Sequence, residues 1–283
     1  MPVAPNTLRV VRPDGVEVLK LGIDSSYILR ALDLGFPDVR DSTEAIPGMD
    51  GEVDTTAHVG ARAITAEVVV SQVGAGPLVD KLAGVMHPGA RYWLYVGRAD
   101  WPGERRILAR GASFACPPSN IRTAQMGFRC PSGVLEDATE QEVTLSPQGS
   151  AVGGETLPET LPETFDPGLV PGAALIDVGG TASVPPAIDV YGPCTDPLVR
   201  VVTTGAQMIL RGDIAAGDFV RINTAARTIL RNNDPNYSVY GQLDFAASTW
   251  MTLPVGENVQ VVFSPASSSG GCQAVLRWAN RWL

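Results

Sequence analysis

The sequence predicts a mainly β protein, with two β domains joined by an acidic linker. Gly 30 and Pro 23 among 283 residues, together with many Val, Ile and Thr, favour short strands and turns over long helices. A segment rich in acids, proline and threonine, without apolar periodicity, separates two strand-rich regions. We therefore expect a first β domain over residues 1–135, a linker over 136–171 and a β-sandwich over 172–283.

The first region shows about seven strand-like segments and one helix, which favours a barrel-like or curled sheet. Pro13-Asp14-Gly15 lies between two alternating runs and predicts a hairpin. The helix is expected over 76–87, where Gly76-Pro77 starts it and apolar residues recur at helical spacing. Pro88-Gly89 ends it.

A long strand, "RAITAEVVV" over 62–70, is the first candidate for contacts between subunits. Ile64, Ala66 and Val68 share one face and Val69 lies on the other, so both faces carry apolar groups. That pattern suits a strand covered on both sides, as when a neighbour's sheet packs on it. The preceding loop, with Pro47-Gly48 and Asp50-Gly51, could reach an adjacent subunit. The candidate interface residues are Pro47, Asp50, Gly51, Arg62, Ile64 and Val69.

The linker is predicted from charge and proline spacing. No Lys or Arg lies between Arg129 and Arg200, whereas that stretch holds eleven of the thirty acids. The rest of the chain, with nineteen acids against twenty-one Lys and Arg, has a net charge of +2. Pro158 and Pro162 remove backbone donors every fourth position, so we expect neither a helix nor a central strand there. An extended tether is the interpretation.

From Gly172 onward, ten short apolar runs at spacings of about ten residues predict the sandwich. In "GDFVRINTAARTIL", Phe219, Arg221 and Asn223 should face one way and Val220, Ile222 and Thr224 the other, with "NTAA" as the turn. Trp278 and Trp282 fall on one face of the last predicted strand. We expect both to close one end of the same core.

Charge, cysteine count and hydropathy exclude several classes of protein. A net charge of −9 disfavours sequence-independent binding to DNA phosphates. No stretch has the composition of a signal peptide or a membrane span, so we expect a cytoplasmically made protein. Four widely spaced cysteines indicate buried free thiols, and a Cys116–Cys130 bridge across a hairpin stays possible.

We assign no catalytic, cofactor-binding or metal-binding residue. His58 and His87, the only histidines, have no nucleophile or acid motif beside them, and Asp33, Asp38 and Asp41 match no calcium loop. The glycines at 73–77 are better explained by the start of the helix than by a nucleotide loop. The chain is predicted not to be an enzyme.

The order of several motifs resembles the distal tail protein family of siphophages, whose members are also called minor tail proteins. The motifs are "PGMDGEVD" and "HVGARAITAEVVV" in the first half, then "VGGTASVPPAIDVYGPCTDPLV", "GDFVRINTAARTIL" and "STWMTLPVGENVQVVF". The resemblance covers about 30–130 and 172–283. Asp196 and Asn223 are mild departures, because they stand where the family usually has Asn and Asp, and either residue suits a turn.

The resemblance implies a structural virion protein of the tail tip, assembled in the host cytoplasm. In the family the N-terminal domain forms a six-membered ring, a homohexamer, and the C-terminal sandwich is galectin-like. The ring joins a tail tube protein to a tail-tip or tail fibre hub protein, and DNA passes through it without specific binding; no membrane is involved. The alternative is a carbohydrate-binding host-adsorption module of the tail tip, although residues 172–283 contain no histidine for a galectin-type sugar site.

Overall fold

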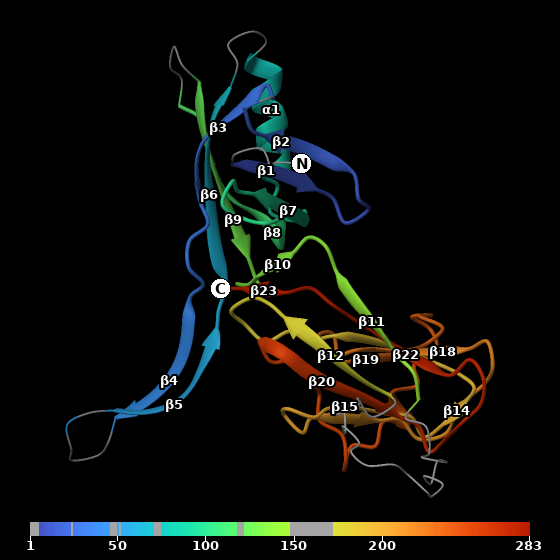
Figure 1. The fold of residues 1–283 in the computed structure, drawn as a ribbon. Coiled ribbons are helices and arrows are strands. Elements are labelled where there is room, and N and C mark those ends of the chain that lie inside the picture. The colour runs from blue at the N-terminus through green and yellow to red at the C-terminus, as the bar shows by residue number, and fades with distance from the viewer. Residues whose placement is uncertain are drawn as a thin grey trace, which may run out of the picture. The chain divides into compact units, whose positions relative to one another are not determined.

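The structure, a computed structural model, describes residues 6–23, 25–45, 50, 52–70, 75–117, 122–147 and 172–283. The chain divides into two compact units. The N-terminal unit comprises 1–139 together with 281–283, and the C-terminal unit comprises 140–280. The predicted mainly β fold with a single α-helix is confirmed for the described residues (Figure 1).

The N-terminal unit is a curled sheet covered on one side by the helix. Its strands follow the order β2-β1-β7-β8-β9-β6-β3, so the sheet is open, with β2 and β3 at its ends. The strands on this path are β1 (Thr7–Val11), β2 (Glu17–Leu21), β3 (Tyr27–Asp33), β6 (Arg62–Val70), β7 (Tyr92–Gly97), β8 (Arg105–Ala115) and β9 (Thr123–Cys130). The core contains residues from these strands and from α1 (Ala75–Val85).

The local predictions for this unit hold where the periodicity is strong. β1 and β2 form the expected hairpin, and the Asp14 carboxylate accepts a hydrogen bond from the Val16 amide in its turn. The helix buries Leu82 and Val85 of its apolar stripe, and Met86, directly after the helix, is buried as well. Leu82 is fully buried because the apolar face of α1 packs against the sheet.

Two further pieces belong to the N-terminal unit. The hairpin of β4 (Val39–Ala45) and β5 (Glu52–Val59) forms a two-stranded sheet of its own, which Figure 1 shows projecting from the unit. β10 (Leu135–Asp137) pairs with both β8 and β23 (Arg281–Trp282). The last residues of the chain therefore return to the N-terminal unit.

The return of β23 corrects the expectation for the two tryptophans. Trp278 lies in the core of the C-terminal unit, whereas Trp282 packs against the N-terminal core. The Arg105 guanidinium lies 3.7 Å from the ring centroid of Trp282 and 4.0 Å from that of Trp101, and the Trp282 Nε1–H donates to Asp137 at 2.8 Å. The strand ends at Trp278, so strand spacing no longer relates the two rings.

The C-terminal unit is the predicted β-sandwich. A five-stranded sheet, β11-β22-β13-β18-β19, and a four-stranded sheet, β12-β20-β15-β16, supply most of one hydrophobic core. The strands of these sheets are β11 (Gln141–Leu145), β12 (Ala173–Val178), β13 (Ala187–Tyr191), β15 (Leu198–Val201), β16 (Gln207–Ile209), β18 (Phe219–Asn223), β19 (Thr228–Arg231), β20 (Gly256–Ser264) and β22 (Gln273–Trp278). A third sheet comprises β14 (Cys194–Thr195), β17 (Asp213–Ile214) and β21 (Ser267–Ser268), and η1 (Tyr240–Gln242) is a short 3-10 helix.

The predicted β18–β19 hairpin is confirmed, with Val220 and Ile222 buried and the Asn223 carboxamide accepting from the Ala226 amide in the turn. On the opposite face of this sheet, Asp189 is 1% exposed. Its two oxygens accept hydrogen bonds of 2.6 Å from Arg221, and Arg277 also binds it. A buried carboxylate shared by two arginines on neighbouring strands fixes the register of the sheet's outer face.

Regular structure extends into the stretch that was expected to be linker. β10 and β11 lie within 135–145, and β11 pairs with β22 along five residue positions, with Leu145 buried in the sandwich core. The apolar alternation of β11 is only two residues long, because Val143 and Leu145 are its inward side chains. The proline repeat at 155–165 lies outside the described residues.

Candidate subunit interface

The strand singled out from the sequence, β6, lies between β3 and β9 in the N-terminal sheet. Ile64 is fully buried in the unit's own core together with Ala66 and Val68. Ile64 is thus occupied by packing within its own chain, and we do not retain it as an interface residue. Val69 lies on the opposite face and is half-buried.

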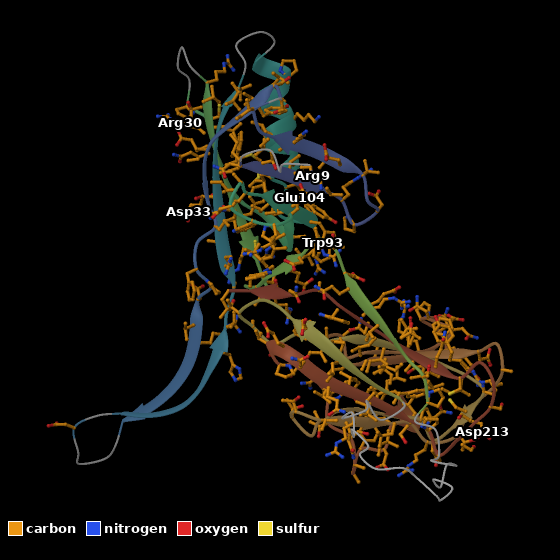
Figure 2. All side chains as sticks on the ribbon, viewed as in Figure 1. Arg9, Arg30, Asp33, Trp93, Glu104 and Asp213 are labelled. Carbon is orange, nitrogen blue, oxygen red and sulfur yellow. The ribbon has the colours of Figure 1, made fainter. Side chains whose placement is uncertain are left out.

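That opposite face of β6 belongs to a sheet surface that the described residues leave uncovered. A hollow of about 260 Å³ lies on it, across β3, β6, β9 and β8. Its lining residues are Ala31, Asp33, Thr65, Ala66, Glu67, Ser113, Gln125, Met126 and Gly127. Figure 2 labels Asp33 and Arg30, whose guanidinium donates to Glu67 at 2.9 Å.

The floor of this hollow depends on a glycine. A Cβ at Gly127 would lie 2.3 Å from the Ser113 Oγ, so the hydroxyl occupies the space that a side chain would fill. Small side chains and two carboxylates together form a shallow polar depression. Such a surface suits contact with another protein better than enclosure of a small molecule, which requires a deeper apolar pocket.

The β4–β5 hairpin, residues 39–59 and hereafter the arm, forms a two-stranded sheet of its own. Among the described residues its strands pair with each other and with no other strand. Two isolated strands are marginal in water, and their open edges are available for pairing with another chain. Asp50 is exposed at the arm's tip, while Pro47 and Gly51 lie outside the described residues.

An exposed apolar group surrounds the base of the arm. Val39 and Val59, which pair directly across β4 and β5, are 60% and 47% exposed, and nearby Phe36 is 70% exposed. We call Phe36, Val39 and Val59 the root patch. Exposed apolar side chains that gather at one place are candidates for a contact surface. The sequence does not indicate this patch, because single apolar residues beside a proline carry no periodic signal.

Arg62, at the start of β6, is the most unusual charge in the unit. Its side chain is 2% exposed, and neither Nε nor Nη2 has a hydrogen-bond partner among the residues that the structure describes. Burial lowers the pKa of this guanidinium, and the nearby Cys130 thiol partly offsets that effect.

Two exposed arginines, Arg110 and Arg129, are direct cross-strand neighbours on the outer face of the sheet and have no ion-pair partner among the described residues. Directly opposed like charges destabilise a sheet unless acids from elsewhere bind them.

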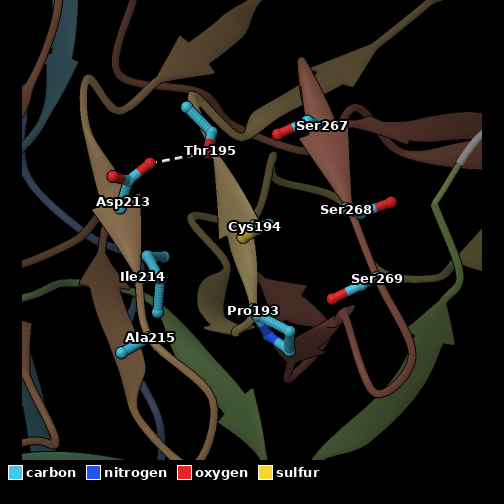
Figure 3. A pocket seen from close by; sticks show the side chains of 9 residues that line it. All are labelled: Pro193, Cys194, Thr195, Asp213, Ile214, Ala215, Ser267, Ser268 and Ser269. Atoms are coloured by element: carbon cyan, nitrogen blue, oxygen red, sulfur yellow. Dashed lines mark hydrogen bonds between the residues drawn. The ribbon is translucent and has the colours of Figure 1, made fainter.

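In the C-terminal unit, a hydroxyl-lined depression of about 410 Å³ lies on the small sheet of β14, β17 and β21 (Figure 3). The Thr195 hydroxyl donates to Asp213 at 2.5 Å, and Ser267, Ser268 and Ser269 line the opposite side. Burial raises the pKa of the Cys194 thiol in this depression to about 12. A thiol with that pKa stays protonated at neutral pH and is a poor nucleophile.

A second surface of the C-terminal unit is aromatic. Tyr240 and Phe245 are 38% and 58% exposed, with ring centroids 5.4 Å apart. Tyr240 also stacks on Trp250, which packs against the sandwich core. The structure therefore places Trp250 at the edge of the core, stacked on Tyr240.

The described residues form no group of three or more His, Cys, Asp or Glu side chains that could hold a metal ion. His87 accepts a hydrogen bond from the Gly89 amide after the helix, and His58 lies in β5 of the arm. No described helix is long and apolar enough to span a membrane. All four cysteines are free, so the Cys116–Cys130 bridge is not formed.

An arm and arginines without a described partner, together with an apolar root patch, are typical of a component that assembles with other protein subunits. Comparison with protein families identifies the kind of assembly: residues 179–282 match the C-terminal domain of the siphovirus-type tail component family. The predicted resemblance to siphophage distal tail proteins is thereby confirmed, and residues 179–282 carry a domain of siphophage tail components.

Solved structures show the same fold over the whole chain. The crystal structure of the SPP1 Dit protein, described as a paradigm of the hub adsorption apparatus in phages infecting Gram-positive bacteria, has a TM-score of 0.68 at 11% identity, covering 98% of this chain and 99% of that one. A chain of the phage P2 baseplate, in its activated conformation with calcium, gives 0.51 at 9% identity, covering 97% of each. No curated protein sequence matches the chain.

Proposed function

We propose that this protein forms a closed homohexameric ring at the end of a siphophage tail, with the N-terminal units making the ring contacts. The observation that carries the proposal is the arm, which has no partner strand in the described part of its own chain. Opposite charges support it, because residues 39–59 contain five acids and one arginine, whereas Arg110 and Arg129 of the same unit have no ion-pair partner in the described part of the chain.

The acidic arm and the surface with Arg110 and Arg129 are different surfaces of one unit. Contacts between different surfaces of identical subunits are head-to-tail, and such contacts close into rings when the rotation permits. The number six comes from the resemblance to distal tail proteins. The ring would dock a tail tube protein on one rim and a tail-tip or tail fibre hub protein on the other. DNA would pass through it without specific binding, in keeping with the chain's net charge of −9.

Particle mass of the full-length chain tests this function directly. We expect a species of six times the 29.8 kDa chain mass, visible as rings by negative-stain microscopy. Replacing residues 39–59 by a short Gly-Ser link should leave a folded monomer. The link has little distance to close, because the Gly60 amide already donates to the Asp38 carbonyl at 2.6 Å. Rings that form without the arm would contradict its role.

The alternative, a carbohydrate-binding adsorption module, has one observation in its favour. The exposed rings of Tyr240 and Phe245 could stack on a sugar. Calorimetry with host cell-wall saccharides tests it, with Tyr240→Ala as the variant and Tyr237→Ala as the control for loss of an exposed tyrosine. Binding that Tyr240→Ala removes would support the alternative; equal weak binding by all three proteins would reject it.

A further inference from the structure

Two of the four thiols lie together in the C-terminal unit. Cys194 and Cys272 belong to the same buried core cluster, where they are 5% and 6% exposed. Their side chains are close enough to hydrogen bond to each other. A buried thiol usually acts as a small apolar side chain, but two thiols in contact can also be joined by oxidation.

The backbone holds both cysteines in fixed positions. Cys194 lies in the central strand of the small sheet, where it pairs with β17 on one side and with Ser268 of β21 on the other. The Ser269 amide donates to the Pro193 carbonyl at 3.4 Å, and the Cys272 amide donates to the Ser269 carbonyl at 3.2 Å. The segments that carry the two thiols are thus hydrogen-bonded to each other. Joining the sulfur atoms therefore needs little backbone movement.

The depression on the small sheet gives a small reagent access to the pair. Cys194 lines this depression, which has a volume of about 410 Å³ (Figure 3). Burial raises the pKa of the Cys194 thiol to about 12, and burial also raises the pKa of Cys272. Because the thiolate is the reactive form, oxidation of the pair is slow, and both cysteines stay reduced where thiols predominate.

We propose that Cys194 and Cys272 form a disulfide bond when the protein leaves a reducing environment and meets a small-molecule disulfide. The Cys194 thiolate attacks one sulfur of the reagent and releases a first thiolate. The Cys272 thiolate then attacks the Cys194 sulfur of the mixed disulfide and releases the second. The protein loses two electrons and two protons, and the reagent takes up both to become two thiols.

This bond connects β14 to the turn before β22, two segments that are far apart in the sequence. A disulfide that closes a long loop restricts the unfolded chain strongly. Oxidation should therefore stabilise the C-terminal unit. The inference does not depend on the proposed ring, because both cysteines belong to one unit of one chain.

Counting free thiols in the full-length chain tests the proposal. Reduced protein is incubated at pH 8 with oxidised glutathione, quenched with acid and alkylated in guanidinium chloride. Untreated protein should carry four labels. After oxidation, mass spectrometry should find the Cys194 and Cys272 peptides linked, with neither label nor glutathione on either. The melting temperature of the C-terminal unit should rise by about 5–10 °C, and a reductant should reverse this shift.

Two variants separate this pair from the other thiols. The chain with Cys116→Ala and Cys130→Ala keeps the pair and should form the link at the wild-type rate. Cys272→Ala removes the second thiol, so Cys194 should keep its label or a glutathione adduct. The melting temperature of Cys272→Ala should then not rise on oxidation.

The measurements on the wild-type chain decide the proposal even where a variant folds poorly. Labels that remain on both Cys194 and Cys272 after prolonged oxidation would overturn it. A link that forms only in urea, or one that lowers the melting temperature, shows that the folded pair does not accept the geometry of a disulfide, and overturns it as well.

Discussion

Replacing Leu145 by alanine should destabilise the C-terminal unit by about 3 kcal/mol, although residue 145 lies in a stretch with the composition of a linker. Leu145 is 1% exposed and packs into the sandwich core from β11, which pairs on one side only, with β22. Buried Leu→Ala substitutions cost about 2–5 kcal/mol, and an edge strand can relax partly into the cavity, which places the estimate in the lower half of that interval.

The assay is urea unfolding of the full-length chain, followed by hydrogen exchange of peptides from Gln273–Trp278, the partner strand. With a urea dependence of about 2 kcal/mol per molar, the midpoint for these peptides should fall by about 1.5 M. Thr144→Ala, at an exposed position of the same strand, is the control and should shift the midpoint by less than about 0.3 M, as is usual for surface substitutions. If Leu145→Ala behaves like this control, β11 is not part of the C-terminal unit.

Three further outcomes follow from contacts described above. Asp189→Asn should lower the stability of the C-terminal unit by about 3 kcal/mol in the same assay, because two arginines lose their shared carboxylate; a change below about 0.5 kcal/mol would contradict that role. Trp282→Ala should destabilise the N-terminal unit by about 3 kcal/mol and leave the C-terminal unit unchanged, and the reverse result would refute the return of β23. In the native protein at pH 8, a thiol reagent should modify Cys116 before Cys130, because burial raises the pKa of the Cys130 thiol to about 12 and Cys130 is fully buried; equal rates by mass spectrometry would contradict this order.

Strand and helix positions were predictable wherever one face of an element repeats over several residues. The β18–β19 hairpin and the stripe of α1 are such cases, because alternation or helical spacing identifies their buried side chains. β11 was missed for a physical reason: only Val143 and Leu145 face the core, and the acids around them dominate the composition. Two inward residues are too few to distinguish a strand from a linker.

The candidate interface was only partly accessible from the sequence. Apolar residues on both faces of β6 indicated a doubly covered strand, but Ile64 is covered by its own chain. The alternation of apolar residues in β6 does not show whether a neighbouring subunit or the core of the same unit covers each face of the strand. Arg62 was selected by position, while its lack of a partner depends on tertiary contacts that no sequence pattern encodes. The register that brings Arg110 opposite Arg129 is equally a property of the folded sheet.

The pairing of β10 with β23 has a consequence for how this protein can evolve. Leu135 pairs with Trp282 and Glu136 with Arg281, so the chain departs from the first unit and re-enters it on adjacent antiparallel strands. Residues 140–280 are in effect a cassette whose two ends emerge side by side. A recombination event could exchange that cassette for any domain with neighbouring termini and leave the first unit's sheet intact. We expect a graft of a small domain with adjacent ends at positions 139 and 281 to fold, and to preserve the ring assembly proposed above while removing every surface of residues 140–280.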